Sequence, residues 1–249
     1  MHIPDGLFDV PTSAAAGAVA VAGVAWCVRR AEADLDDRLA PLAGLTAAFV
    51  FAVQMLNFPV LPGVSGHLLG GALAATLVGP AAGALCLTVV LLVQMLFADG
   101  GVTAIGLNIT IMGFTTALAG YALVRGLLRV LPRTTASVPL AAGVAAGLTV
   151  PLTAAVFTAV YAVGGTTAVP VATLATAMVG VHLAIGVGEG VITAATVAAV
   201  VAVRPDLVHA ARGLARPRTV VLPDGPAPEP ARPRPAAERA DAEQSGGAR

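Results

Sequence analysis

The chain has 249 residues, of which 57% are hydrophobic and only 11% are charged, with 14 basic and 14 acidic side chains. A soluble domain carries about 25% charged residues, so this composition and a mean hydropathy of +0.87 indicate a membrane protein. The zero net charge argues against nucleic acid as a partner, because binding phosphate requires a basic surface.

Residues 1–12 form a short N-terminal segment ahead of the first long apolar run. Residues 13–203 are dominated by apolar runs, and we expect them to form a transmembrane helical bundle. Residues 204–249 hold eight of the 14 arginines and eight of the 18 prolines. A segment this polar and rich in proline cannot bury a core, which predicts a disordered tail.

Apolar runs of the length needed to cross about 30 Å of hydrocarbon follow one another along the body. They predict an all-α, polytopic membrane bundle of about seven transmembrane helices, at 13–28, 39–56, 66–78, 81–97, 104–131, 138–163 and 172–203. The third run is too short to cross alone. An uncharged stretch with two prolines precedes it, which suggests a segment dipping into the membrane beside a protein-walled cavity.

Arginine placement predicts the orientation of the bundle. Arginines follow the first, fifth and seventh runs, at Arg29, Arg30, Arg38, Arg125, Arg129, Arg133, Arg204, Arg212, Arg216 and Arg218. The intervening loops 57–65, 98–103 and 164–171 contain none. The positive-inside rule then places the N-terminus outside and the C-terminal tail in the cytoplasm. We expect the protein to lie in the cell membrane of a prokaryote.

The first residues, Met1-His2-Ile3-Pro4-Asp5-Gly6, are not a signal peptide, because no basic residue comes before Arg29. Met1 is expected to be retained with a free α-amine, since His2 is bulky. The amine, the His2 amide nitrogen and the His2 imidazole could form two fused chelate rings on a metal. A fourth nitrogen would complete a square plane, which suits Ni(II) or Cu(II) better than Zn(II). The alternative is that His2 is a polar residue in a frayed terminus.

His67, which begins the third run, is the candidate for that fourth nitrogen. An ionisable residue in a membrane segment indicates function by default, because its burial is costly. A histidine bonded to a backbone carbonyl is the structural alternative. Two glycine pairs four residues apart, at 143 and 147 and at 186 and 190, predict close helix contacts.

Five further polar residues in the body could support the metal ligands through hydrogen bonds. A ligating histidine usually donates its second ring N–H to a carboxylate, a carbonyl or water. His182 and Glu189 are two helical turns apart and share one face. Roles that merely tie loops and helices together are at least as plausible for each residue. The five are Gln94, Asp99, Asn108, His182 and Glu189.

Several motifs of this chain resemble the CbiM/NikM family, the substrate-binding membrane subunits of cobalt/nickel energy-coupling-factor (ECF) importers. The resemblance covers essentially all of 1–203 and leaves out the tail. It rests on Met1-His2-Ile3-Pro4-Asp5-Gly6, Gly66-His67-Leu68-Leu69-Gly70-Gly71, Leu92-Val93-Gln94-Met95-Leu96-Phe97-Ala98-Asp99-Gly100-Gly101, Gly106-Leu107-Asn108 and His182-Leu183-Ala184-Ile185-Gly186-Val187-Gly188-Glu189-Gly190.

The resemblance implies that Met1, His2 and His67 bind Co(II) or Ni(II) as a transported substrate, with the choice of metal left open. It also implies a transmembrane coupling subunit (CbiQ/NikQ-like), two cytoplasmic ATPase subunits (CbiO/NikO-like) and a separate small membrane subunit (CbiN/NikN-like). The chain itself has no GxxxxGK[ST] loop for a nucleotide. A vitamin-binding ECF subunit is the main alternative, disfavoured by only ten aromatic residues. A membrane metalloenzyme is less favoured still, since no HExxH pattern occurs.

Overall fold

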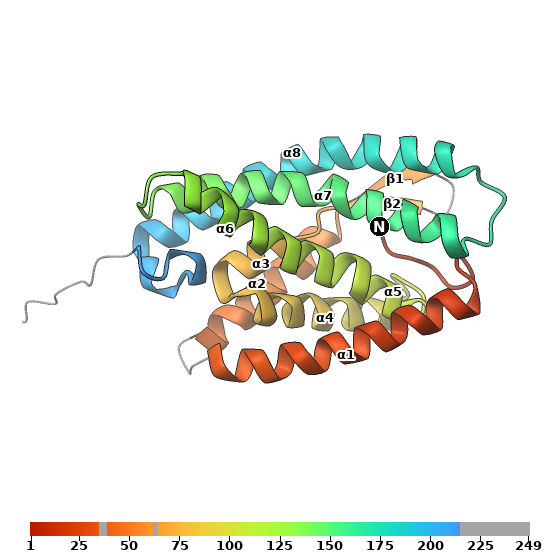
Figure 1. The fold of residues 1–249 in the computed structure, drawn as a ribbon, viewed down its shortest axis with the longest axis horizontal. Coiled ribbons are helices and arrows are strands. Elements are labelled where there is room, and N and C mark those ends of the chain that lie inside the picture. Colours follow the sequence, from red (N-terminus) through yellow and green to blue (C-terminus); the bar gives the residue numbers. More distant parts are fainter. Residues whose placement is uncertain (35–38, 62–63, 215–249) are drawn as a thin grey trace, which may run out of the picture. The chain divides into compact units, whose positions relative to one another are not determined.

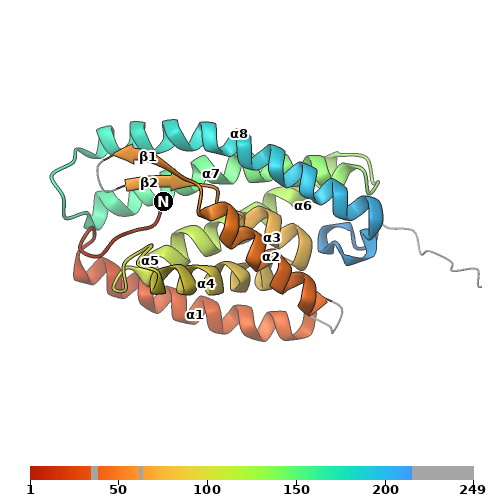
Figure 2. The same cartoon turned by 180° about the vertical axis from the view of Figure 1, so that it is seen from behind.

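The computed structural model describes residues 1–34, 39–61 and 64–214, and these form a helical bundle with one small hairpin (Figures 1 and 2). Long apolar runs free of internal charge favour helices, since a helix satisfies its own backbone hydrogen bonds in lipid. The helices are α1 (Val10–Asp34), α2 (Leu39–Gln54), α3 (Gly71–Val78), α4 (Pro80–Leu96), α5 (Ile105–Asn108), α6 (Gly120–Val130), α7 (Ser137–Gly164) and α8 (Val171–Val203). A π-helical stretch, Ile109–Ala119, joins α5 to α6.

Four helical segments are long and apolar enough to span a membrane: Val10–Glu32, Ile105–Val130, Ser137–Gly164 and Val171–Val203. Two shorter apolar helices, Leu39–Gln54 and Pro80–Leu96, accompany them among the described residues. The prediction of a polytopic helical membrane protein is therefore confirmed. The third run contributes only the eight residues of α3, about 12 Å at 1.5 Å per residue, which is too short to cross the hydrocarbon.

A β-hairpin corrects the all-α prediction. β1 (Asn57–Leu61) pairs antiparallel with β2 (Val64–His67), and Asn57 lies opposite His67. The third run, expected to be helical from residue 66, therefore begins as a strand, and His67 precedes α3 instead of opening it. Gly70 explains the change of direction, because its φ of 75° is a left-handed conformation that side chains disfavour.

α3 lies at the centre of the bundle, and all eight of its residues are buried. Its neighbours are α2, α4, α6, α7 and the π-helical stretch. Alanine and glycine make up half of α3, which allows these helices to approach it closely. α1 differs, since large apolar side chains such as Val19, Val21 and Trp26 are exposed on it, as expected for a helix facing lipid.

α7 and α8 pack along most of their length (Figure 1). A Cβ added to Gly143 would lie 2.8 Å from the Gly190 carbonyl oxygen, and one added to Gly186 would lie 2.5 Å from the Gly147 carbonyl oxygen. Both distances are shorter than real Cβ contacts. The two glycine pairs therefore mark a close contact between helices, as the sequence predicts.

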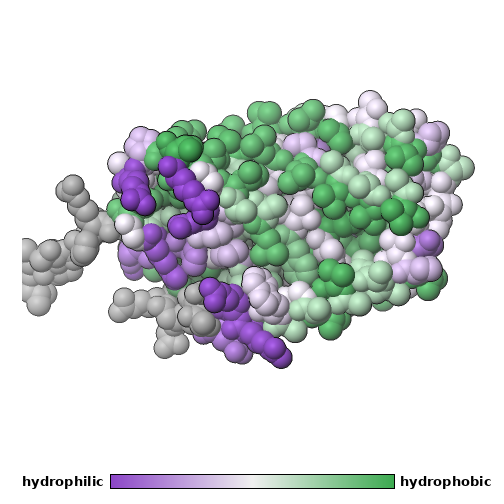
Figure 3. All heavy atoms as spheres, viewed as in Figure 1, coloured by the Kyte–Doolittle hydropathy of each residue, from purple (hydrophilic) through white to green (hydrophobic). Residues whose placement is uncertain are grey.

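The two ends of the bundle differ in polarity. Strongly hydrophilic side chains gather at the end where α1 and α6 finish and α7 begins (Figure 3). The N-terminal segment and the loops 97–104 and 164–167 meet at the other end. Every arginine among the described residues thus lies at the end opposite these loops.

The first part of the predicted disordered tail is folded. Pro205–Leu207 and His209–Ala211 form short 3-10 helices, and Val208, Ala210 and Ala211 are buried. The apolar Val-His-Ala-Ala stretch explains this, because it supplies side chains that pack against the bundle. The rest of the expected tail, 215–249, lies outside the described residues.

Candidate metal-capture site

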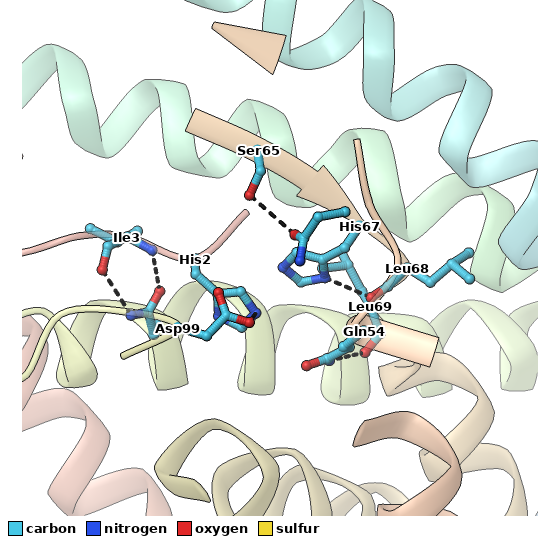
Figure 4. A network of polar contacts seen from close by, with 10 residues as sticks. His2, Ile3, Gln54, Ser65, His67, Leu68, Leu69 and Asp99 are labelled. Atoms are coloured by element: carbon cyan, nitrogen blue, oxygen red, sulfur yellow. Dashed lines mark hydrogen bonds and ion pairs between the residues drawn. The ribbon is translucent and has the colours of Figure 1, made fainter. Parts of the chain in front are cut away.

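The N-terminal residues lie inside the bundle and not at its surface. Met1 and Ile3 are 1% and 0% exposed. Asn108 pairs with the main chain of Ile3 as a neighbouring strand would: Ile3 N–H donates to Asn108 Oδ1 at 2.8 Å, and Asn108 Nδ2 donates to the Ile3 carbonyl at 3.2 Å. Gly101 N–H donates to the same carbonyl at 2.8 Å. Figure 4 shows the polar contacts around this segment.

A second set of bonds ties down the next residues. The Asp5 carboxylate accepts the main-chain N–H groups of Thr103 at 2.7 Å and Val102 at 3.2 Å, and also the Thr103 hydroxyl. These bonds, led by that of the Thr103 hydroxyl, lower the pKa of Asp5. Thr166 donates through its N–H to the Leu7 carbonyl and through its hydroxyl to the Gly6 carbonyl. The segment is therefore fixed on both sides by loops.

His2 and His67 come together as the sequence predicts. Their rings stack with centroids 4.3 Å apart and planes 19° apart, and the two residues are 8% and 0% exposed. His67 Nδ1 donates to the Leu68 carbonyl oxygen at 2.7 Å, since that oxygen can only accept. The lone pair of His67 therefore lies on Nε2, which is buried and has no hydrogen-bond partner among the described residues.

His2 turns its Nε2 atom toward Asp99. Its Nε2 lies 3.5 Å from Asp99 Oδ2, which leaves Nδ1 for the six-membered ring with its own amide nitrogen. Burial, followed by the charge of the N-terminal amine, lowers the pKa of His2 to about 3. Burial also lowers the pKa of the Met1 α-amine well below 8.0. Burial therefore disfavours the protonated form of both groups, and the neutral forms carry the lone pairs that a metal binds.

The donor set fits Co(II) or Ni(II) by its chemistry, but the rings must turn to use it. Two nearly parallel rings cannot both hold one cation in their planes, so coordination by both requires one ring to rotate. No cluster of three or more His, Cys, Asp or Glu side chains suited to a metal occurs among the described residues.

His67 is positioned by the chain turn that follows it. Glu189 on α8 accepts the main-chain N–H groups of Leu69 at 2.5 Å and Gly70 at 2.9 Å. Gln54 on α2 donates to the Leu69 carbonyl at 2.7 Å. Glu189 and Gln54 are 2% and 0% exposed, so both bonds are shielded from water. Glu189 therefore supports His67 through the backbone and does not reach it directly.

His182 and Gln94 are buried, and each has a polar side-chain atom that is not hydrogen-bonded among the described residues. His182 Nδ1 donates to the Met178 carbonyl at 2.7 Å, and its Nε2 has no partner among the described residues. A Cβ added to Gly66 would lie 3.0 Å from the His182 ring, so this ring packs beneath the strand that carries His67. Neither polar atom of the Gln94 side chain is bonded within the described part of the chain.

Sequence reasoning missed two residues that the structure makes important, Gln54 and Asp5. Gln54 is an isolated amide in the long apolar run 39–56. A lone polar residue in such a run could have indicated a buried hydrogen bond. Asp5 lies inside the opening motif but is not among the predicted ligands. Its role in fixing the loop 102–103 depends on a contact nearly a hundred residues away in sequence.

Comparison with known proteins decides the family. The model of the cobalt uptake substrate-specific transmembrane region, CbiM, matches residues 2–207. The chain belongs to the CbiM family. A cobalt transport protein CbiM of Sorangium cellulosum is 34% identical over 216 residues, covering 84% of this chain and 94% of that protein.

Nickel transporters and a solved structure are also similar. The fused nickel transport protein NikMN of Rhodobacter capsulatus is 40% identical over 127 residues, which cover 49% of this chain and 37% of that protein. A truncated transition metal transporter of known crystal structure superimposes with a TM-score of 0.75 at 28% identity, covering 81% of this chain and 99% of that one.

Membership of the CbiM family excludes the enzyme alternative. The family is a transport component whose homologues carry cobalt or nickel across a prokaryotic membrane. The metalloenzyme that the sequence left open is therefore ruled out. The vitamin-binding alternative finds no support among these relatives.

Proposed function

We propose that this chain is the substrate-capture component of an ECF-type importer and takes up Co(II) or Ni(II) from outside the cell. The metal is held by the α-amine of Met1, the amide and imidazole Nδ1 nitrogens of His2, and His67 Nε2. The observation that carries the proposal is the stacking of His2 on His67 at 4.3 Å, beside a buried N-terminus. His67 Nε2 has no other partner there.

The proposed chelate uses the chemistry of main-chain nitrogens. A neutral amine binds a metal directly, while the His2 amide must lose its proton, so capture releases protons and strengthens as the pH rises. His2 Nε2–H directed at Asp99 orients the ring, as a carboxylate does for ligating histidines in general. Asn108 and Asp5 hold the segment at the depth at which Met1 and His2 reach His67.

An N-terminal extension tests the chelate. Adding two residues, Gly-Ser, ahead of Met1 converts its amine to an amide and leaves every side chain in place. The affinity for Ni(II) or Co(II), measured by calorimetry on the purified chain, should fall more than about 100-fold, since one ligand is lost. A matched extension of the same two residues after Arg249 should leave the affinity unchanged. Full affinity in the N-terminal extension would show that the amine is not a ligand.

The proposed orientation places the N-terminal segment outside and the arginine-rich end in the cytoplasm. Single cysteines at Thr166 and at Arg133 test it, because these residues mark opposite ends of the bundle. A membrane-impermeant maleimide applied to whole cells should label Thr166→Cys and not Arg133→Cys. The native Cys27 and Cys86 are buried, and labelling of the unsubstituted chain gives the background. The reverse pattern would contradict the orientation.

The proposed partners are a CbiQ/NikQ-like coupling subunit, two CbiO/NikO-like ATPases and a separate small CbiN/NikN-like membrane subunit. Support comes from the fused NikMN relatives, in which this region is joined to further sequence. Coexpression should give ATP-dependent uptake of radioactive nickel or cobalt in vesicles, and that uptake should be lost with the N-terminal extension. Uptake by this chain alone, without ATPases, would contradict the assembly.

A further inference from the structure

A basic pocket lies at the end of the bundle opposite the metal-capture site. Its volume is about 510 Å³, and it opens beside the last turns of α6 and the folded residues after α8. Four arginines and three small or apolar residues line it: Arg125, Leu128, Arg129, Arg133, Arg212, Gly213 and Leu214. No metal-capture residue takes part in it, so its role is independent of the proposed function.

The four guanidinium groups have no acidic partner within the described residues. Arg204, close by in sequence, shows the contrast, because its guanidinium pairs with Asp206 at 2.8 Å. Arg125 and Arg129 are one helical turn apart and project on the same face of α6. Like charges held together in one pocket repel each other, and an anion bound among them relieves that repulsion.

The pocket lies at the depth of the lipid headgroups. The segment Ile105–Val130 is long and apolar enough to cross a membrane. Arg125 and Arg129 lie in its last two turns, where a spanning helix leaves the hydrocarbon core. Trp26, half exposed on α1 and one turn before Arg29 and Arg30, marks the same interface.

The lining combines charge with apolar surface. Leu128 and Leu214 lie among the arginines, and Val130 on the same helix is 80% exposed. A free inorganic anion makes no favourable contact with these apolar groups. A phospholipid contacts both kinds of group, because its phosphate binds the guanidinium groups while its glycerol and acyl carbons pack against leucine and valine.

We propose that this pocket binds the phosphate of an anionic phospholipid, phosphatidylglycerol or cardiolipin, at the arginine-rich membrane face. The planar guanidinium group donates two parallel hydrogen bonds to phosphate, which suits arginine in particular to this ligand. The bound lipid fixes the end of α6 to the folded residues 212–214. It thereby links the last helix of the bundle to the membrane surface.

Lipid retention by the full-length chain tests the proposal. The affinity for short-chain phosphatidylglycerol is measured by native mass spectrometry on detergent-purified protein and on Arg129→Gln/Arg212→Gln. A charge-assisted hydrogen bond from a pocket arginine to the phosphate contributes about tenfold to the affinity, so the double variant should bind roughly 100-fold more weakly. Phosphatidylcholine, which has no net charge, should bind weakly to both proteins.

Arg29→Gln/Arg30→Gln is the matched control, because it removes the same charge at the same end without touching the pocket. It should weaken phosphatidylglycerol binding less than about twofold. Equal losses in the two double variants would overturn the proposal, because they would show a diffuse charge effect. Displacement of the lipid by excess inorganic phosphate would also overturn it, in favour of a free-anion site.

The acidic residues of 215–249 are the competing occupant within the chain. Their replacement by amides, at Asp224, Glu229, Glu238, Asp241 and Glu243, should leave phosphatidylglycerol binding unchanged. A rise in lipid affinity would show that these carboxylates fill the pocket in the native chain, and would overturn the lipid assignment. Melting curves that coincide with the native curve ensure that each variant is folded.

Discussion

The two ends of the bundle differ in how their polar groups are paired. At the end that holds the N-terminus, Asp5, Asn108 and Glu189 accept or donate specific hydrogen bonds at short distance. At the other end, four arginines line an open pocket with no acidic partner within the described residues. The N-terminal end is held in one geometry by hydrogen bonds. The arginine-rich end presents positive charge at the membrane surface.

The difference follows from what each end must bind. A small cation is recognised by a few nitrogens at fixed positions, so the chain around Met1, His2 and His67 is held by buried hydrogen bonds that exclude water. A membrane surface is recognised by charge over a wide area, for which mobile guanidinium groups suffice. Substitutions at the metal-capture end test each of these contacts separately.

Removal of the Glu189 carboxylate should have the largest effect. Glu189→Leu leaves the N–H groups of Leu69 and Gly70 buried and unsatisfied, at about 1–3 kcal/mol each. We expect a marked fall in melting temperature together with loss of nickel binding, since His67 loses its support. Glu189→Gln keeps one carboxamide oxygen as an acceptor and should show a smaller fall in both. A melting curve of Glu189→Leu equal to that of the native chain would contradict this role.

His67→Ala should separate binding from stability. His67→Ala loses the Nδ1–H bond to the Leu68 carbonyl and leaves a buried cavity, so stability should fall about as much as in His182→Ala, which loses the matching bond to the Met178 carbonyl. The affinity for nickel, however, should fall more than about 100-fold with the loss of a ligand. The measurement is calorimetry alongside a melting curve.

His182→Ala is the control for that prediction, because His182 is an equally buried imidazole with an unpartnered Nε2 on α8. It should retain affinity within about tenfold, as expected for a group outside the ligand set. If His182→Ala loses as much affinity as His67→Ala, the proposed set of four nitrogens is wrong.

The sequence predicts the long helices and the glycine contacts of α7 and α8 well, because both follow from composition and local spacing. It also predicts the meeting of His2 and His67, first because an ionisable residue in a membrane segment indicates function and then through resemblance to a family. The β-hairpin escapes prediction because 57–67 lacks charge, and hydropathy does not distinguish a buried strand from a helix. The supporting residues Gln54 and Asp5 escape because their partners are distant in sequence.

The folded residues 204–214 teach a related lesson. Proline and arginine dominate the composition of 204–249 as a whole and thereby conceal the short apolar stretch 207–211. Burial of Val208, Ala210 and Ala211 depends on the helices they pack against, which no composition window contains. Average composition therefore identifies a polar, proline-rich tail but does not locate the residue at which the tail begins.

Asn108→Ala should loosen the N-terminal segment without removing a ligand. Two hydrogen bonds to Ile3 are lost, and its buried N–H is left unpaired while its carbonyl still accepts from Gly101, a cost of about 1–3 kcal/mol. Hydrogen exchange of residues 1–9 should become faster, and nickel should dissociate faster. Asn57→Ala, which removes an exposed amide bonded to Ser65, should change neither rate. Unchanged exchange in Asn108→Ala would mean that the loop bonds of Asp5 suffice.

Acid should destabilise the metal-capture end while leaving the arginine-rich end unaffected. Burial lowers the pKa of His2 from 6.5 to about 3, so between these values the unfolded chain takes up a proton that the folded chain does not. The free energy of unfolding of the metal-free protein therefore decreases as the pH falls from 6.5 toward 3.

Comparison with His2→Asn tests the source of this pH dependence. The variant removes the titrating group and should give a flatter profile of melting temperature between pH 6.5 and 4, with hydrogen exchange at residues 1–9 less dependent on pH. Arg129→Gln, at the opposite end, should reproduce the native profile. Equal slopes for the native chain and His2→Asn would assign the acid sensitivity to other groups and remove His2 as the titrating element of this end.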